Sequence, residues 1–153
     1  MTQPATQKRG RRIAMTKEEL DAFLAEERTC RVATVSPSGP HVTPLWFVWD
    51  GDFLWIYSLT KSQRWTDAVR DPRVAVAVDA GIEYMELRGV EIVGEVEVVG
   101  EAPRKGADVP ELTQPESLFA KKYFGIEDMP HDGRHGWLRL RPATIRSWDF
   151  RKL

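Results

Sequence analysis

The chain has 153 residues, a formal net charge of −1, and a composition that is 42% hydrophobic and 29% charged, which suits one globular domain with its own core. The near-neutral charge gives no general attraction to polyanions, so no nucleic-acid partner is expected. Cys30 is the single cysteine, which excludes an intrachain disulfide and a cysteine zinc cage and favours a reducing, cytoplasmic location.

Residues 1–14 are polar and basic and are expected to form a flexible tail. The basic residues between positions 8 and 12 are not followed by an apolar run, so neither a signal peptide nor a membrane span is expected there. Residues 15–153 are expected to form a single domain. Thr16 and Glu19 make a capping box, which predicts a first helix over about residues 17–27.

The middle of the chain is rich in predicted strands. Three strands, separated by turns that contain Pro or Gly, are predicted at 31–35, 41–49 and 53–57. A short amphipathic helix over residues 63–70 follows, and Asp71-Pro72 ends it. Alternating apolar residues then predict β structure at 73–78 and 85–99, with bulges or bends at Gly89 and Gly94.

The last third of the chain combines loops, one helix and two predicted strands. A loop at residues 101–114 precedes a helix at 115–124, which Gly125 ends, and strands are predicted at 137–141 and 144–150. Six or seven strands joined mostly by tight turns do not fit a doubly wound sheet. The sequence predicts a mostly β (α+β) fold, a small barrel of mainly antiparallel strands with short flanking helices.

The junction between the third strand and the next helix has the chemistry of a phosphate site. A helix start leaves backbone N–H groups unpaired and carries partial positive charge, which hydroxyl and basic side chains reinforce. Those side chains are Ser58, Thr60, Lys61, Ser62 and Arg64. In the alternative interpretation, Thr60 or Ser62 only caps the helix while Lys61 and Arg64 are solvated.

Familiar catalytic signatures are missing from the sequence. It contains no dinucleotide fingerprint, Walker loop or nucleophile elbow, so no catalytic residue is assigned. His41, His131 and His135 are interpreted as surface histidines, and no metal site is expected.

Aromatic residues are concentrated on two consecutive predicted strands. They are Trp46, Phe47, Trp49, Phe53, Trp55 and Tyr57. Alternate members face the barrel interior, so the other half would be exposed unless a ligand or a second subunit covers it.

Four segments occur in an order and spacing that resemble a known family. They are Val42-Thr43-Pro44-Leu45-Trp46, Tyr57 to Arg64, Asp71-Pro72-Arg73-Val74 and Leu87-Arg88-Gly89-Val90-Glu91. Over about residues 16–150 the chain resembles the split β-barrel flavin and deazaflavin oxidoreductases, which are FMN-binding-protein-like in fold and related to pyridoxamine 5′-phosphate oxidase.

This resemblance implies a homodimer with two interface clefts, each binding a flavin or the deazaflavin coenzyme F420. The phosphate would lie on the Ser58 to Arg64 junction, the tricyclic ring would lie along Val42 to Trp46, and Trp148 of the partner subunit would line the cleft. The cofactor-binding residues implied in this way are Val42, Thr43, Pro44, Leu45, Trp46, Tyr57, Ser58, Thr60, Lys61, Ser62, Arg64 and Trp148.

The second strand carries Thr43-Pro44-Leu45-Trp46 where pyridoxamine 5′-phosphate oxidases carry basic residues, so the resemblance favours the F420-dependent branch. Such a reductase passes a hydride from reduced deazaflavin to an unsaturated or quinone-like small-molecule acceptor, while the protein supplies position and electrostatics. The proton would come from Tyr57, His41 or water. The alternatives are an FMN-dependent oxidoreductase, a non-catalytic cofactor- or haem-binding module, and an aromatic surface that only builds a dimer.

Overall fold

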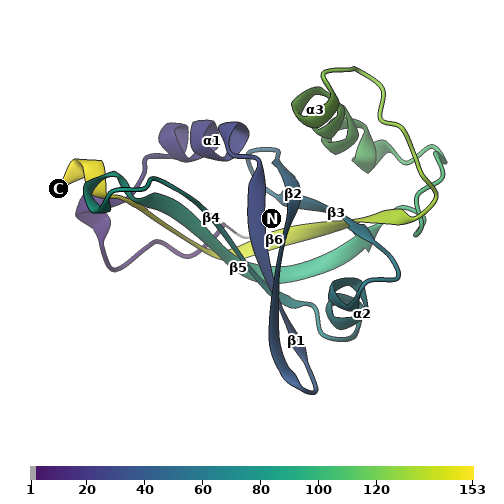
Figure 1. Ribbon diagram of the computed structural model, residues 1–153, viewed down its shortest axis with the longest axis horizontal. Helices are drawn as coiled ribbons and strands as arrows, with labels where there is room; N and C mark the ends of the chain where they lie inside the picture. The colour runs from purple at the N-terminus through teal and green to yellow at the C-terminus, as the bar shows by residue number, and fades with distance from the viewer. Residues whose placement is uncertain (1–2) are drawn as a thin grey trace.

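The alternating segments of the chain form six strands in a closed barrel with the order β1-β2-β3-β6-β5-β4, as the computed structural model shows for residues 3–153 (Figure 1). Every neighbouring pair is antiparallel. The strands are β1 (Thr29–Ser36), β2 (Gly39–Trp49), β3 (Leu54–Leu59), β4 (Arg73–Ala80), β5 (Arg88–Val99) and β6 (His135–Asp149). The predicted mostly β barrel with flanking helices is confirmed.

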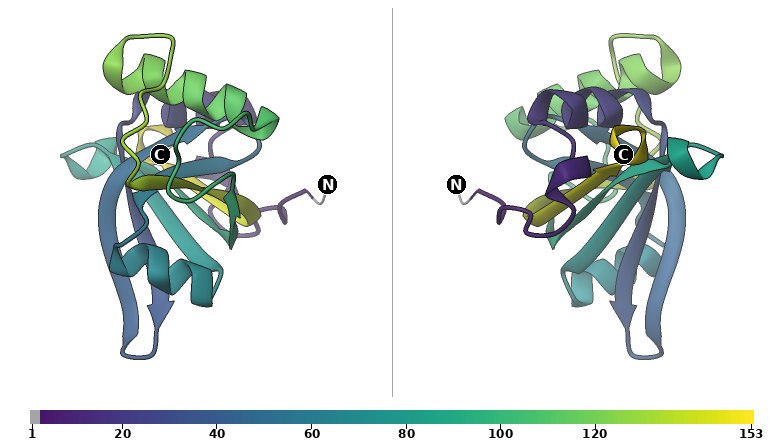
Figure 2. Two further views of the ribbon diagram at one scale, coloured as in Figure 1. Left: turned by 90° about the vertical axis from the view of Figure 1, so that its right-hand side faces the viewer. Right: turned by 90° about the vertical axis from the view of Figure 1, so that its left-hand side faces the viewer.

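Three α-helices flank the barrel: α1 (Lys17–Glu26), α2 (Gln63–Arg70) and α3 (Thr113–Phe124). The capping box holds, because Thr16 Oγ1 accepts a hydrogen bond from the Glu19 N–H at 3.1 Å. Figure 2 shows α1 and α3 toward one end of the molecule, α2 toward the other, and the β1–β2 hairpin extending past α2. No helix within residues 3–153 combines the length and the apolar composition needed to cross a bilayer.

The buried apolar residues form two layers. The barrel interior is filled from all six strands and from α1 and α2, and includes Leu24, Cys30, Phe47, Ile56, Val76, Ile92 and Leu140. Burial raises the pKa of the Cys30 thiol to about 12, so it stays protonated inside this core. The outer layer lies between α3 and the sheet and includes Val48, Trp55, Leu112, Phe119, Tyr123 and Trp137.

The two strands predicted at 137–141 and 144–150 are one continuous strand, β6, so that part of the prediction is wrong. Pro142 lies opposite Gly94, where the register between β5 and β6 shifts. Since the ladder is already irregular at this bulge, the missing N–H of proline does not interrupt the strand. The irregularity at Gly94, which the sequence predicts as a bulge or bend, therefore also allows β6 to contain Pro142.

The segment from Gln3 to Ala14 runs beside β6. The Ala5 N–H donates to Ala143 O at 2.9 Å, and Gln7 exchanges two hydrogen bonds with the backbone of Ser147. The expectation of a flexible tail remains a prediction, and its first two residues lie outside the described part of the chain.

Gly94→Ala should destabilise the protein strongly. A Cβ at position 94 would lie 2.0 Å from the backbone oxygen of Arg141, so the β5–β6 ladder would have to move. We expect the free energy of unfolding to fall by about 3–4 kcal/mol in urea titrations. Gly125→Ala is the control, because a Cβ there meets nothing within 4 Å and only the positive φ is strained, at about 1 kcal/mol. Equal losses in the two variants would contradict the steric explanation.

Candidate functional site

The barrel opens between β2 and β3. These strands pair only at Phe47↔Ile56, Val48↔Trp55 and Trp49↔Leu54. Beyond that point β2 stays paired with β1 and β3 stays paired with β6, so the two neighbours separate. A cavity of about 540 Å³ lies in this split, a size usual for small-molecule sites. Its lining is Leu45, Trp46, Tyr57, Leu59, Arg64, Phe119, Phe124, Met129, Pro130, His131, Asp132 and His135.

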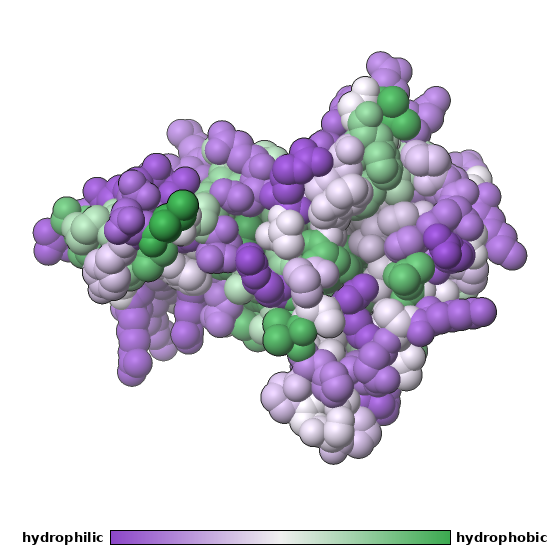
Figure 3. All heavy atoms as spheres, viewed as in Figure 1, coloured by the Kyte–Doolittle hydropathy of each residue, from purple (hydrophilic) through white to green (hydrophobic). Residues whose placement is uncertain are grey.

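One wall of the cavity is aromatic. The indole of Trp46 stacks on Tyr123 with ring centroids 4.3 Å apart and planes 11° from parallel, and Phe124 meets it edge-on at 6.1 Å. Trp46 is nevertheless 42% exposed. Figure 3 shows further hydrophobic residues exposed over α3, at the upper right. A stacked but open indole is a suitable surface for a planar ligand.

Arg64 supplies the positive charge of the cavity. Its Nη1 donates to Thr43 Oγ1 at 2.7 Å and its Nε donates to Ser58 Oγ at 3.2 Å, so the guanidinium bridges β2 and β3 where they separate. Burial lowers the pKa of Arg64, but a guanidinium remains charged at neutral pH. The side chain is therefore a half-buried cation with N–H groups left for a ligand.

The helix that carries Arg64 is held firmly at its start. Ser62 Oγ accepts a hydrogen bond from the Trp65 N–H at 3.1 Å, which makes Ser62 the cap. Farther along α2, buried Asp67 accepts hydrogen bonds from Gln63 at 2.7 Å and from Thr34 of β1 at 3.2 Å. The hydrogen bond from Gln63 is the main reason that the pKa of Asp67 is lowered. These contacts fix α2, and hence Arg64, relative to the barrel.

The structure separates the predicted cofactor residues into groups. Leu45, Trp46, Tyr57 and Arg64 line the cavity, and Thr43 and Ser58 hold Arg64. Thr60, Lys61 and Ser62 instead line a second hollow of about 390 Å³, and the Thr60 hydroxyl donates to Arg134 O at 3.2 Å. The cap interpretation thus holds for Ser62, whereas Arg64 is not simply solvated.

The remaining predicted cofactor residues lie outside the cavity of their own chain. Val42 and Pro44 are exposed on β2. Trp148 pairs with Gly89 near the far end of β6, eleven residues along the strand from Trp137. Whether Trp148 of the partner subunit lines the cleft stays a prediction.

The expectation that a ligand or a second subunit must cover the outward aromatic residues is wrong for most of them, because α3 of the same chain covers them. Trp55 is buried and Tyr57 half-buried, because α3 crosses the outer face of the sheet and packs Phe119 against it. Strand alternation identifies the outward face, but it does not show that a helix about 60 residues later in the chain covers that face. Of these outward residues, Trp46 alone keeps substantial exposure within the described chain.

Tyr57 has an unusual environment. Its ring stacks on His135 at 4.8 Å and contacts Trp137 at 4.7 Å and Phe119 at 5.5 Å. Its hydroxyl oxygen is the one buried side-chain polar atom in residues 3–153 without a hydrogen-bond partner. Burial raises the pKa of Tyr57 to about 12, and the charges of Asp132 and Glu116 act in the same direction. A buried hydroxyl without a partner costs about 1–3 kcal/mol, so it calls for an explanation.

Eight of the residues that line the cavity are not among the predicted cofactor residues, and two of them, Asp132 and His135, form a polar pair. His135 Nδ1 lies 2.5 Å from Asp132 Oδ2, and Asp132 Oδ1 accepts the N–H groups of Arg134 and His135. Burial acts to raise the pKa of Asp132, but these hydrogen bonds outweigh it and the pKa is lowered. The register Leu59↔His135 between β3 and β6 brings this pair beside Tyr57, and no local sequence pattern indicates that pairing.

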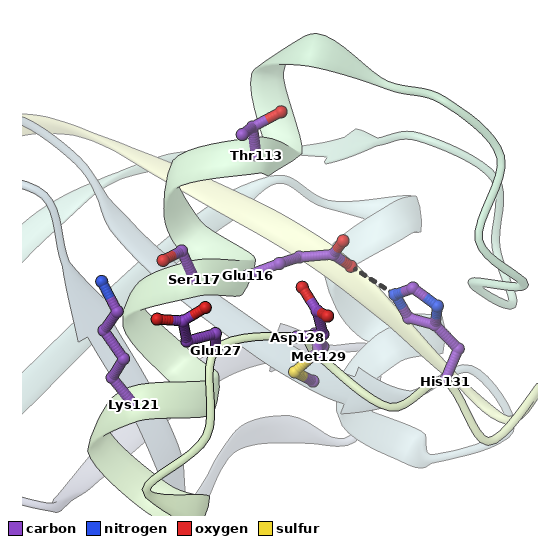
Figure 4. Close-up of a pocket in the computed structure, with 8 residues that line it drawn as sticks. All are labelled: Thr113, Glu116, Ser117, Lys121, Glu127, Asp128, Met129 and His131. Atoms are coloured by element: carbon purple, nitrogen blue, oxygen red, sulfur yellow. Dashed lines mark hydrogen bonds and ion pairs between the residues drawn. The ribbon is translucent and has the colours of Figure 1, made fainter.

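A buried carboxylate fastens α3 over the cavity. Glu116 accepts two hydrogen bonds from Arg104, at 2.9 and 3.0 Å, and one from Trp137 Nε1 at 3.0 Å. Figure 4 shows Glu116 reaching from α3 toward His131, whose Nε2 lies 3.0 Å away. The adjoining hollow of about 620 Å³ also exposes Glu127 and Asp128. No group of three or more His, Cys, Asp or Glu in residues 3–153 is arranged to hold a metal ion.

The fold and the cavity together define a split β-barrel protein with a cavity between two separating strands. The family model described as pyridoxamine 5′-phosphate oxidase matches residues 16–149. The chain therefore belongs to the pyridoxamine 5′-phosphate oxidase family, and the resemblance seen in its motifs is confirmed.

Solved structures show the same relationship. The conserved hypothetical protein Rv2991 from Mycobacterium tuberculosis is 31% identical, with a TM-score of 0.75 over 97% of this chain and 92% of that chain. An F420 reductase is 26% identical, with a TM-score of 0.59 over 82% and 94%. A FAD-binding protein from Mesorhizobium loti, 18% identical with a TM-score of 0.65 over 88% and 93%, shares the fold. No curated protein matches the chain.

Tyr123→Phe should destabilise the protein, because this tyrosine hydroxyl is fully used. It accepts the Phe47 N–H at 3.0 Å and has the carbonyl oxygens of Arg28 and Phe47 at 2.7 Å. Removing it leaves these buried groups unpaired, so the free energy of unfolding should fall by about 1–3 kcal/mol. Chemical denaturation would measure the loss, and a variant as stable as the original would show that Tyr123 does not tie α3 to β2.

Proposed function

We propose that this protein is an F420-dependent oxidoreductase that transfers a hydride from reduced deazaflavin to an unsaturated or quinone-like small molecule. The observation that carries the proposal is the half-buried Arg64 guanidinium at the edge of an aromatic cavity in the split barrel. A charged end and an apolar end in one cavity match a ligand with a phosphate and a tricyclic ring.

The phosphate end would be held by α2 and its surroundings. Arg64 keeps guanidinium N–H groups beyond those bound to Thr43 and Ser58. The N–H groups of Gln63 and Arg64 belong to the first turn of α2, where they have no intrahelical partner and where the helix dipole favours an anion. The hydroxyl oxygens of Thr43 and Ser58 hold the guanidinium in place from the two strands.

The ring end fits the residues that line the cavity. Trp46 offers an open aromatic face, Leu45 and Phe124 add apolar surface, and the unpaired Tyr57 hydroxyl offers one polar contact. When bound, the reduced cofactor supplies the hydride. The residues of this chain bind the phosphate, orient the ring and exclude water from the covered side of the sheet.

An FMN-dependent oxidoreductase is the second candidate, because Arg64 can hold the phosphate of either cofactor. F420 is favoured by the segment Thr43-Pro44-Leu45-Trp46, which carries no basic side chain, and by the 26% identity to an F420 reductase. A cytoplasmic location is part of the proposal and rests on the composition of the chain.

We also infer a homodimer. Val42, Pro44 and Trp46 lie at alternate positions of β2, so they share one face, and Val42 is 66% exposed. A second copy that covers this apolar stripe would complete the cleft with Trp148 of the partner subunit. Val42→Arg places a charge in that contact, so light scattering after gel filtration should show a monomer. A Val42→Arg protein that remains dimeric would contradict this interface.

Arg64→Ala should weaken binding of F420 to the cofactor-stripped protein. Loss of charge-assisted hydrogen bonds worth about 1.5–3 kcal/mol corresponds to about 10- to 150-fold in Kd, measured by fluorescence titration. Lys61→Ala is the matched control: this exposed lysine lines the other hollow, so we expect less than about a threefold change.

Thermal melts of both variants verify that they fold, and the same titrations with FMN compare the two cofactors. Equal losses of F420 affinity in Arg64→Ala and Lys61→Ala would show that the phosphate does not bind at Arg64 in the cavity between β2 and β3. Tighter binding of FMN than of F420 would move the protein to the flavin-dependent branch. Binding of neither cofactor would refute the proposed function.

A further inference from the structure

We propose that the Tyr57 hydroxyl donates a hydrogen bond to a ring carbonyl oxygen of the ligand that occupies the split cavity. This inference deepens the proposed function and rests on it for the nature of the ligand, a planar ring compound. The carbonyl belongs either to the cofactor ring or to a quinone-like acceptor, and titration with both kinds of ligand separates these sources.

Comparison of two tyrosines shows that the missing partner is particular to Tyr57. Tyr57 and Tyr123 both pack against Phe119 of α3, with ring centroids 5.5 and 4.7 Å away. The Tyr123 hydroxyl has partners on β2 and in the segment before β1, whereas the Tyr57 hydroxyl has none within residues 3–153. The fold thus satisfies one tyrosine internally and leaves the other, which lines the cavity, for an external group.

The position of this hydroxyl is fixed by its neighbours. The Tyr57 ring is stacked on His135, and Trp137 and Phe119 contact it as well. Asp132 holds His135 through Nδ1. A hydroxyl held in place before the ligand arrives loses little freedom on binding, so its hydrogen bond can contribute to affinity.

The charges around the cavity select a neutral oxygen as the partner. Burial raises the pKa of Tyr57, and the negative charges of Asp132 and Glu116 act in the same direction and are partly offset by Arg104, so the hydroxyl keeps its proton at neutral pH. Negative charge of this kind disfavours a carboxylate or phosphate at the Tyr57 hydroxyl, while Arg64, which also lines the cavity, attracts an anion to its own guanidinium. A neutral ring carbonyl accepts the hydrogen bond from Tyr57 without adding a negative charge near Asp132 and Glu116.

Tyr57→Phe tests this assignment, because it removes only the hydroxyl. The cofactor-stripped proteins are titrated with menadione, with 2-methylnaphthalene, which has the same ring without carbonyl oxygens, and with F420. We expect wild-type protein to bind menadione and Tyr57→Phe to lose about tenfold in affinity for a carbonyl ligand, the equivalent of one hydrogen bond. Affinity for 2-methylnaphthalene should stay within about twofold.

Stability gives a second readout that does not depend on a ligand. Removing an unpaired buried hydroxyl should raise the Tm of the ligand-free protein by about 3 °C. Tyr123→Phe, the same chemical change at a satisfied hydroxyl, should instead lower the Tm. A Tm that falls in Tyr57→Phe would mean that the hydroxyl is already satisfied, which overturns the proposal.

Comparing the titrations with menadione and with F420 identifies which ligand supplies the carbonyl. A tenfold loss for menadione places the acceptor at Tyr57, and a tenfold loss confined to F420 places the cofactor ring there; both support the hydrogen bond. Unchanged affinities, an equal loss for 2-methylnaphthalene, or no binding of menadione and F420 by wild-type protein would overturn it.

The outcomes also separate this inference from the proposed function. If Arg64→Ala weakens F420 binding but Tyr57→Phe changes neither F420 nor menadione affinity, the proposed function is supported and the Tyr57 hydrogen bond is refuted. If neither F420 nor FMN binds but Tyr57→Phe weakens menadione binding, the hydrogen bond is supported and the cofactor assignment is refuted.

Discussion

The short pairing of β2 with β3 is the constraint on which the rest of this structure depends. After three residue pairs each strand follows a different partner, β2 with β1 and β3 with β6. Where two strands separate, their edges lose the backbone hydrogen bonds between them. In this chain Arg64 bridges the gap instead, through hydrogen bonds to Thr43 of β2 and Ser58 of β3. The same separation that breaks the sheet creates the cavity and places a cation at its edge.

The outer wall of the cavity depends on a buried charge cluster. Glu116 would be costly to bury alone, but Arg104 and Trp137 satisfy its carboxylate, and His131 adds a further contact. This cluster joins α3, β6 and the loop after β5 at one point. With α3 held there, Phe119 packs against Tyr57 and closes the cavity from outside the sheet. In the proposed function, this arrangement would orient a ligand that has one anionic end and one neutral ring.

Local signals predicted the elements well where one or two residues decide them. The helix at 63–70 has the expected bounds because Ser62 caps it and Asp71-Pro72 ends it. Gly125, with φ of 67°, ends α3 as expected. Pro142 misled the prediction, since its tolerance inside β6 depends on the bulge at Gly94 in a different strand. The sequence is a poor guide to residues such as Pro142, whose structural role depends on a residue far away in the chain.

The sequence by itself determined the strand and helix segments, the family motifs and the basic, hydroxyl-rich junction, because these depend on neighbours along the chain. Only the tertiary structure decided which of those side chains meet. It turned Arg64 into the cavity and Lys61 away from it, brought His135 beside Tyr57 through the β3–β6 register, and covered the outward aromatic face with α3. These contacts join residues far apart in the chain, and their geometry depends on strand pairing and helix packing, which local propensities do not encode.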